Sequence, residues 1–382
     1  MASTVTRSTF DTAPRTVTSR EAGGDDADAS IGRAGRRPPC QNPRFRVKEV
    51  KTDEGGQLGL FGISEAPIRR RDRDLAQRLE GEHAEAAAIA ARLPKGVFFG
   101  TSTWSFPGWA GIVYSRRGTT AELARKGLSE YARHPLLTTV GIDRGYYGPI
   151  PAHDLQRYAG QLPPGFPCCA KAPEAVTATI LPGGRGPNPD YLRSGRFVEE
   201  MVGPFLEVFR EHTGPFVIQF PPAPRAATPD AALFAEKLDR FLAALPKDAR
   251  YAVELRDPAL LTPAYRSVLA ARGVAHVYNY STAMPMPADQ AQSVALETAS
   301  FAMIRLLLRP GTRYEERREE FLPFDRIVDA NPELRAQVVT LTREALSLGR
   351  ETFVLVNNKA EGCSPLTIRA LAEKLAGEPE PR

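Results

Sequence analysis

The sequence predicts an α/β protein, a (β/α)8 TIM barrel that follows a disordered N-terminal tail. Eight short runs rich in Val, Ile, Phe and Tyr lie between residues 97 and 358. Helical patterns separate most of these runs, which is typical of βαβ units and a parallel sheet. No GxGxxG or GxxxxGK[ST] motif occurs, so a doubly wound nucleotide-binding fold is the less favoured alternative. The predicted strands are residues 97–104, 138–147, 168–173, 214–221, 251–257, 274–280, 302–308 and 352–358.

The N-terminal part of the chain differs in composition from the rest. Residues 1–71 are rich in Gly, Pro, Ser, Thr and mixed charge, and they hold few aliphatic residues. Such a segment buries too little apolar surface to offset the entropy of ordering, so we predict that it is disordered. The Ala, Leu and charge pattern of residues 72–95 predicts a linker helix. The barrel is predicted over residues 96–377, and residues 378–382 form a short tail.

Apolar residues at helical spacing recur between the predicted strands. The first such pattern follows the first strand, and two more flank the fourth. Another follows the fifth strand, one precedes the eighth, and the last closes the barrel. These helices are predicted over residues 121–134, 196–212, 230–245, 263–273, 333–349 and 364–376.

Composition excludes several classes of protein. Lys and Arg total 50 against 45 Asp and Glu, and a net charge of +5 is too small to indicate a duplex-binding surface. No apolar run approaches about 18 residues, so we predict no membrane span and a cytoplasmic location. The four cysteines form no CxxC pair and the five histidines no HxH or HExxH pair. Neither a metal nor a cofactor is therefore predicted.

Alternation along the strands places polar side chains inside the predicted barrel. In residues 251–257, Val253 and Leu255 form the apolar face that meets the helices, so Glu254 and Arg256 point inward. The same test puts three further polar residues inside and two at the end of the eighth strand. These five are Lys171, Gln219, Arg305, Asn357 and Asn358. All lie toward the carboxyl ends of their strands, where TIM barrels carry their active sites.

These residue types predict a site for an anionic ligand. Lys171, Arg256 and Arg305 create a positive field suited to a phosphate, a carboxylate or a nucleic-acid end. Glu254 is the candidate general base or nucleophile, and Asp143 is its candidate partner in acid–base chemistry. The alternative for Glu254 and Arg256 is a structural ion pair that closes the barrel.

Other side chains at the strand ends complete the candidate site. Gln219, Asn357 and Asn358 are expected to orient the ligand by hydrogen bonds, and Trp104 and Tyr146 to stack on a ring. For the two aromatic residues, packing at the rim is the alternative.

The same segments resemble the YecE-like family, also called domain of unknown function 72. The run GTSTWSFPGWAGIVY resembles the opening of that family, and AVELRDPAL resembles its Glu-x-Arg strand. Lys171 with Pro173, the Gln-Phe-Pro run at 219–221, Arg305 and NNKAEG at 357–362 match further motifs in the expected order. The resemblance covers about residues 96–376 and implies a TIM barrel without implying a reaction.

The second strand departs from the family pattern. A Val-Glu-x-Asn-x-Thr-Phe-Tyr run is usual there, whereas this chain has Gly141 for Glu, Asp143 for Asn and Gly145 for Thr. After the third strand, Ala178 stands where a His is usual. These changes predict a different substrate or a loss of activity, with Asp143 as a candidate replacement carboxylate.

The tail contains a short motif, GQLGLFG, with apolar residues in otherwise polar surroundings. Gln57, Leu58, Leu60 and Phe61 resemble the peptide that binds the bacterial sliding clamp. A disordered segment of this kind offers apolar anchors and one amide to a preformed groove. The alternative is that the motif packs on the protein itself. The sequence thus leaves two functions open: a cofactor-free enzyme for an anionic substrate, and a non-catalytic module tethered to replication or repair machinery.

Overall fold

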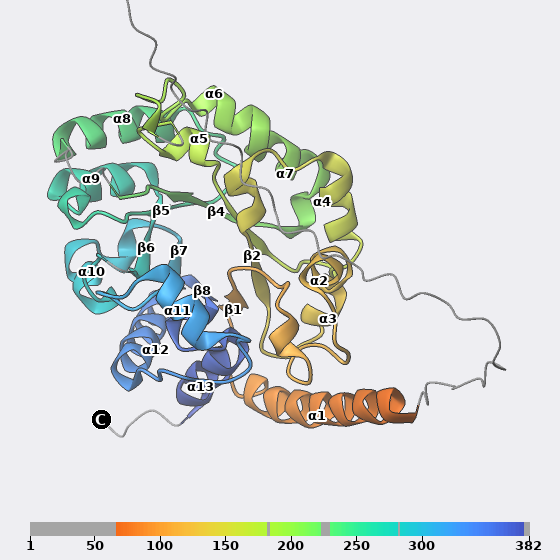
Figure 1. The fold of residues 1–382 in the computed structure, drawn as a ribbon. Helices are drawn as coiled ribbons and strands as arrows, with labels where there is room; N and C mark the ends of the chain where they lie inside the picture. Colours follow the sequence, from red (N-terminus) through yellow and green to blue (C-terminus); the bar gives the residue numbers. More distant parts are fainter. Residues whose placement is uncertain (1–65, 182–183, 223–229, 282, 378–382) are drawn as a thin grey trace, which may run out of the picture. The chain divides into compact units, whose positions relative to one another are not determined.

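The computed structural model of the 382-residue chain describes residues 66–181, 184–222, 230–281 and 283–377. Eight parallel strands close into a barrel in sequence order, which confirms the predicted fold class (Figure 1). Each predicted strand segment overlaps one of them, and β4, β7 and β8 begin one residue before the predicted segments. The strands are β1 (Val97–Thr101), β2 (Thr139–Ile142), β3 (Cys168–Lys171), β4 (Thr213–Gln219), β5 (Tyr251–Glu254), β6 (Ala275–Tyr280), β7 (Phe301–Leu306) and β8 (Glu351–Val356).

Helices surround the barrel, and their bounds differ in places from the predicted segments. The segment predicted over 121–134 forms two short helices that meet at Gly127, where a side chain would press on the carbonyl of Leu123. The helices are α1 (Ala66–Ala90), α2 (Thr120–Lys126), α3 (Leu128–Tyr131), α4 (Ala152–Ala159), α5 (Glu174–Thr177), α6 (Ser194–Phe197), α7 (Gly203–Val208), α8 (Ala231–Ala243), α9 (Pro263–Arg272), α10 (Pro287–Ser293), α11 (Tyr314–Phe321), α12 (Pro332–Ser347) and α13 (Ser364–Ala376).

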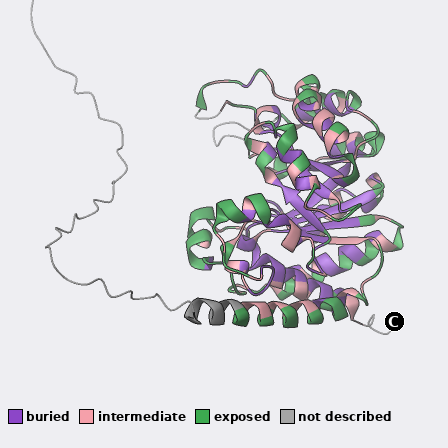
Figure 2. Cartoon of the chain, turned by 90° about the vertical axis from the view of Figure 1, so that its right-hand side faces the viewer, coloured by how far each residue is buried: buried purple, intermediate pink, exposed green. Residues whose placement is uncertain are grey.

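The core has two parts, one on each side of the strands. The larger part lies between the strands and the helices, so the strands are buried and most helices expose their outer face (Figure 2). The smaller part fills the barrel, where Phe98 stacks on Phe353 with ring centroids 4.7 Å apart. Its other members on the strands are Cys169, Val217, Ala252, Ala275, Val277, Phe301, Met303 and Leu355. Each of the strands β3 to β8 thus carries an apolar inward residue two positions before a polar one, which confirms the predicted alternation.

Two glycines allow β1 and β2 to approach closely. A Cβ atom on Gly100 would lie 2.1 Å from the carbonyl oxygen of Thr139. A Cβ atom on Gly141 would lie 2.7 Å from the carbonyl oxygen of Ser102. The departure from the family pattern at Gly141 therefore has a steric reason in this chain, since no side chain fits there without a shift of the backbone.

Helix α1 begins at Ala66, before the predicted start of the linker helix, and it packs against α13. Arg369 on α13 bonds to Glu82 at 2.9 Å and also to Glu85, both on α1. Ile89, near the end of α1, is also buried, so apolar packing adds to this contact. Residues 1–65 lie outside the described residues, so the predicted disorder of the tail stays a prediction.

Candidate functional site

Seven polar residues form a layer at the carboxyl ends of β2 to β8, above the apolar filling of the barrel. Each lies two positions after a residue of the inward face, at one of the last two positions of its strand or directly after it. We call this layer the mouth, and its members are Asp143, Lys171, Gln219, Glu254, Asn279, Arg305 and Asn357. Arg256, two residues after Glu254, joins it through direct contacts. The structure therefore brings together most of the residues predicted for the site.

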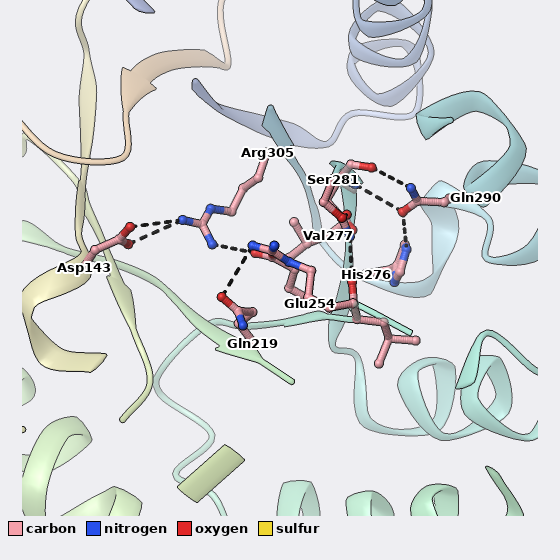
Figure 3. Close-up of polar contacts among 11 residues, drawn as sticks. Asp143, Gln219, Glu254, His276, Val277, Ser281, Gln290 and Arg305 are labelled. Atoms are coloured by element: carbon pink, nitrogen blue, oxygen red, sulfur yellow. Dashed lines mark hydrogen bonds and ion pairs between the residues drawn. The ribbon is translucent and has the colours of Figure 1, made fainter. Parts of the chain in front are cut away.

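Glu254 is the centre of the charge network. Its Oε1 accepts a hydrogen bond from Nε of Arg256 at 2.5 Å, and its Oε2 accepts one from Nη1 of Arg305 at 2.5 Å (Figure 3). The side chain is 0% exposed. Burial alone would raise the pKa of Glu254, but the charges of Arg256, Arg305 and Lys171 outweigh burial and lower this pKa to about 2. Glu254 is thus an ionised carboxylate whose two oxygens are both engaged.

The two arginines extend the network to two further side chains. Nη2 of Arg305 lies 3.4 Å from both carboxylate oxygens of Asp143, and Nη2 of Arg256 lies 3.4 Å from Oε1 of Gln219 (Figure 3). Arg305 is only 2% exposed, whereas the side chains of Arg256 and Asp143 are 22% and 34% exposed. The ends of the network therefore reach solvent, and its centre does not.

Lys171 lies beside this network without joining it. Its Nζ is 3.6 Å from the ring centroid of Tyr146, and the hydroxyl of Tyr146 donates to Oε1 of Glu174 at 3.0 Å. Among the described residues, Lys171 forms no ion pair. Burial lowers the pKa of Lys171 to about 8, and the charge of Asp143 opposes this effect. The site therefore holds a partly buried cation whose only close partner is an aromatic ring.

Three predicted residues have other contacts in the structure. Trp104 is buried in the wall, where its Nε1 donates to the carbonyl of Leu123 at 3.0 Å. Asn358 is also buried, and its Oδ1 accepts from the backbone N–H of Ser364 at 2.8 Å and from its hydroxyl at 2.7 Å. Asn357 accepts at 3.1 Å from the backbone N–H two residues later. These contacts build the wall and the loop after β8, and they leave ligand contact to the other residues.

A buried polar network behind β6 was missed in the sequence. Nε2 of His276 lies 3.1 Å from Oε1 of Gln290, which also accepts from the backbone N–H of Asn279 at 3.1 Å (Figure 3). Burial lowers the pKa of His276 to about 4, so the ring is neutral. The Nδ2 of Asn279 donates to the carbonyl of Leu255 at 3.0 Å. Strand alternation places Asn279 inward with Val277, so this residue could have been found.

Nothing in the described part of the chain resembles a metal centre, because no group of three or more His, Cys, Asp or Glu side chains could hold an ion there. Within the same residues, no helix combines the length and the apolar character that crossing a membrane requires. The motif of Gln57, Leu58, Leu60 and Phe61 lies outside the described residues, so its partner stays a prediction.

Comparisons with known proteins agree with the fold. A search of curated proteins found no match. A DUF72 family protein of Thermotoga maritima superposes with a TM-score of 0.52 at 22% identity, covering 74% of this chain and 99% of that one. A DUF72 family protein of Enterococcus faecalis superposes with a TM-score of 0.51 at 16% identity, covering 72% of this chain and 95% of that one. The family described as "Protein of unknown function DUF72" matches residues 98–382. The chain therefore belongs to the DUF72 family, as the motifs in its sequence predicted.

Proposed function

We propose that the chain is an enzyme of the hydrolase or lyase type that binds an anionic substrate, phosphate-bearing or derived from nucleic acid, at the mouth. The observation that carries this proposal is the convergence of three cations and two carboxylates at the carboxyl ends of four strands. The cations Lys171, Arg256 and Arg305 exceed the carboxylates Asp143 and Glu254 by one charge. Active sites of TIM barrels lie at this end.

Their exposure supports a binding role for Lys171 and Arg256. Both side chains are partly exposed, and Nη1 of Arg256 makes no hydrogen bond within the described residues. Arg305 is enclosed and already serves Glu254 and Asp143. An anion between Lys171 and Arg256 would receive charge-assisted hydrogen bonds from both, which are stronger than bonds between neutral groups.

The catalytic role fits Asp143 better than Glu254. A general base needs an oxygen that is free to take a proton from the substrate or from water. Both oxygens of Glu254 are bonded to arginine, whereas within the described residues Asp143 has only the 3.4 Å contacts with Arg305 and is partly exposed. Asp143 is therefore the proposed base, and Glu254 is a positioning residue that fixes the two arginines.

The binding step is tested by calorimetric titration at pH 7 with inorganic phosphate, simple phosphomonoesters and short oligonucleotides. We expect wild type to bind at least one of these probes and Lys171→Met to weaken the affinity at least tenfold. Lys95→Met is the matched control, because Lys95 precedes β1 at the opposite end of the barrel. Absence of binding by wild type, or equal affinity in Lys171→Met, would contradict the proposal.

The catalytic step is tested with the Asp143→Asn variant on the probe that binds. Removal of a negative charge from the mouth should leave the affinity for the anion unchanged or tighter, while turnover falls at least a hundredfold. Turnover that survives in Asp143→Asn would remove this residue from the mechanism. Tight binding without turnover in wild type would favour the non-catalytic binding module instead.

A further inference from the structure

A second lysine lies next to the mouth, directly after the two asparagines predicted to orient the ligand. Lys359 belongs to the short 3-10 helix η8 (Asn358–Ala360), which directly follows β8 and Asn357. Its side chain is 9% exposed, and its Nζ lies 4.2 Å from the ring centroid of Tyr314 at the start of α11. Within the described residues, this ammonium group has neither a hydrogen bond nor an ion pair.

The environment of Lys359 repeats that of Lys171. Both ammonium groups lie over a tyrosine ring, and burial lowers the pKa of each lysine to about 8. The negative charge of Asp143 acts on both lysines and raises both pKa values, so this carboxylate lies within electrostatic reach of each. Two similar cations therefore lie around one partly exposed carboxylate.

The free-energy cost of burying Lys359 indicates that this side chain has a functional role. Taking an ammonium group largely out of water is costly unless it is paired. A tyrosine ring offsets only part of that cost. In the NNKAEG run at 357–362, the Asn357 side chain fixes the loop backbone, because it accepts a hydrogen bond from the backbone N–H of Lys359 at 3.1 Å. The lysine is thus held in place without an anionic partner from the described residues.

Two further buried groups lack partners in the same region. The Nε of Arg305 and the hydroxyl of Ser102, which directly follows β1, are enclosed and make no hydrogen bond within the described residues. With Lys359 included, four cations face Asp143 and Glu254, and Arg318 and Glu315 act on Lys359 with opposite signs, which leaves two positive charges. A monoanion would neutralise only one of them, and the separate positions of Lys171 on β3 and Lys359 on η8 favour two anionic groups over one doubly charged phosphate.

We infer that Lys359 holds a second anionic group of the ligand, so that the ligand is an organic compound with two separated anionic groups, of the bisphosphate or phosphocarboxylate class. This inference rests on the proposed function, since the first anionic group is the one between Lys171 and Arg256. Tyr314 supports the ammonium of Lys359, and Tyr146 supports that of Lys171.

The test compares one anionic group with two. Methylphosphonate and a series of α,ω-alkane bisphosphonates of increasing chain length are titrated calorimetrically at pH 7. We expect at least one bisphosphonate to bind wild type at least tenfold more tightly than methylphosphonate. Lys359→Met should reduce that affinity to the level of methylphosphonate and change methylphosphonate binding less than threefold. Lys171→Met should weaken both, and Lys95→Met neither.

The outcomes separate the two proposals. Binding of methylphosphonate without a gain for any bisphosphonate would overturn this inference and leave the proposed function standing. No binding of either probe by wild type would overturn both. If Lys359→Met does not fold, Lys359→Gln takes its place, because it also removes the charge of the ammonium. A full gain for the bisphosphonate in either folded variant would overturn the inference.

Discussion

Replacement of Glu254 by glutamine removes the one charge that holds both arginines at the mouth. The substitution keeps the size of the side chain and leaves the guanidinium groups of Arg256 and Arg305 without their common carboxylate. Breaking a buried ion pair on one side costs about 3–5 kcal/mol, because the remaining charge stays buried and uncompensated. Arg305, at 2% exposure, is the group that bears most of this cost.

The pKa of Glu254 gives a second measure of the same interaction. It falls from 4.5 to about 2 in the folded chain, and a depression of this size corresponds to about 3 kcal/mol. Because the folded pKa is the lower one, this stabilisation is fully present above pH 4.5. It is lost as pH falls from about 4.5 to about 2. Glu254→Gln should therefore lower the free energy of unfolding by about 3 kcal/mol at pH 7.

The assay is urea unfolding and thermal unfolding of wild type and variant at pH 7. For about 300 folded residues, an unfolding entropy of about 2 cal/mol/K per residue converts 3 kcal/mol to a drop in Tm of about 5 °C. Glu351→Gln is the matched control, since Glu351 pairs with Arg250 at 2.6 Å but is 50% exposed. That exposed pair contributes about 1 kcal/mol or less. If Glu254→Gln were no more destabilising than Glu351→Gln, Glu254 would not be the centre of the network.

Three further predictions concern other parts of the chain. The affinity for a phosphate probe should fall as pH rises through about 8, because Lys171 then loses the proton that makes it a cation. In titrations between pH 6 and 9.5, an identical profile in Lys171→Met would show that Lys171 plays no part. Gly141→Ala should lower the free energy of unfolding by about 1–3 kcal/mol through overpacking. The control Gly81→Ala, in open space on helix α1, should raise it by about 0.5–1 kcal/mol. Equal urea midpoints for the two variants would contradict the steric reason for Gly141. The tail should retain a bacterial sliding clamp in a pull-down, and retention that survives replacement of both Leu60 and Phe61 by Ala would remove the motif from that contact.

The barrel could be predicted from the sequence because its signals are local. Each strand is a short run of apolar residues, and each polar residue at its end follows the same alternation as the residue two positions before it. This alternation is why Glu254, Lys171, Gln219 and Arg305 were placed inside correctly. Helix α11 was missed for the opposite reason, since YEERREEF carries charge on all sides and has no apolar stripe.

The state of the site could not be predicted, because it depends on contacts between distant residues. The sequence shows Glu254 as a buried carboxylate, but only the fold shows that Arg305, 51 residues later, occupies one of its oxygens. Because of this contact we propose Glu254 as a positioning residue, and the partly exposed Asp143 as the base. Lys359 lies beyond the end of β8, where strand alternation no longer applies, so its place at the mouth also follows from the fold alone.

The central claim is that an anion binds at the mouth between Lys171 and Arg256. Crystals of wild type soaked in tungstate, an anion with strong anomalous scattering, would locate the site directly. We expect the strongest anomalous peak within hydrogen-bond distance of Nζ of Lys171 and the guanidinium of Arg256, and we expect it to vanish in Lys171→Met. A strongest peak on arginines elsewhere on the surface, with no density at the mouth, would contradict the claim.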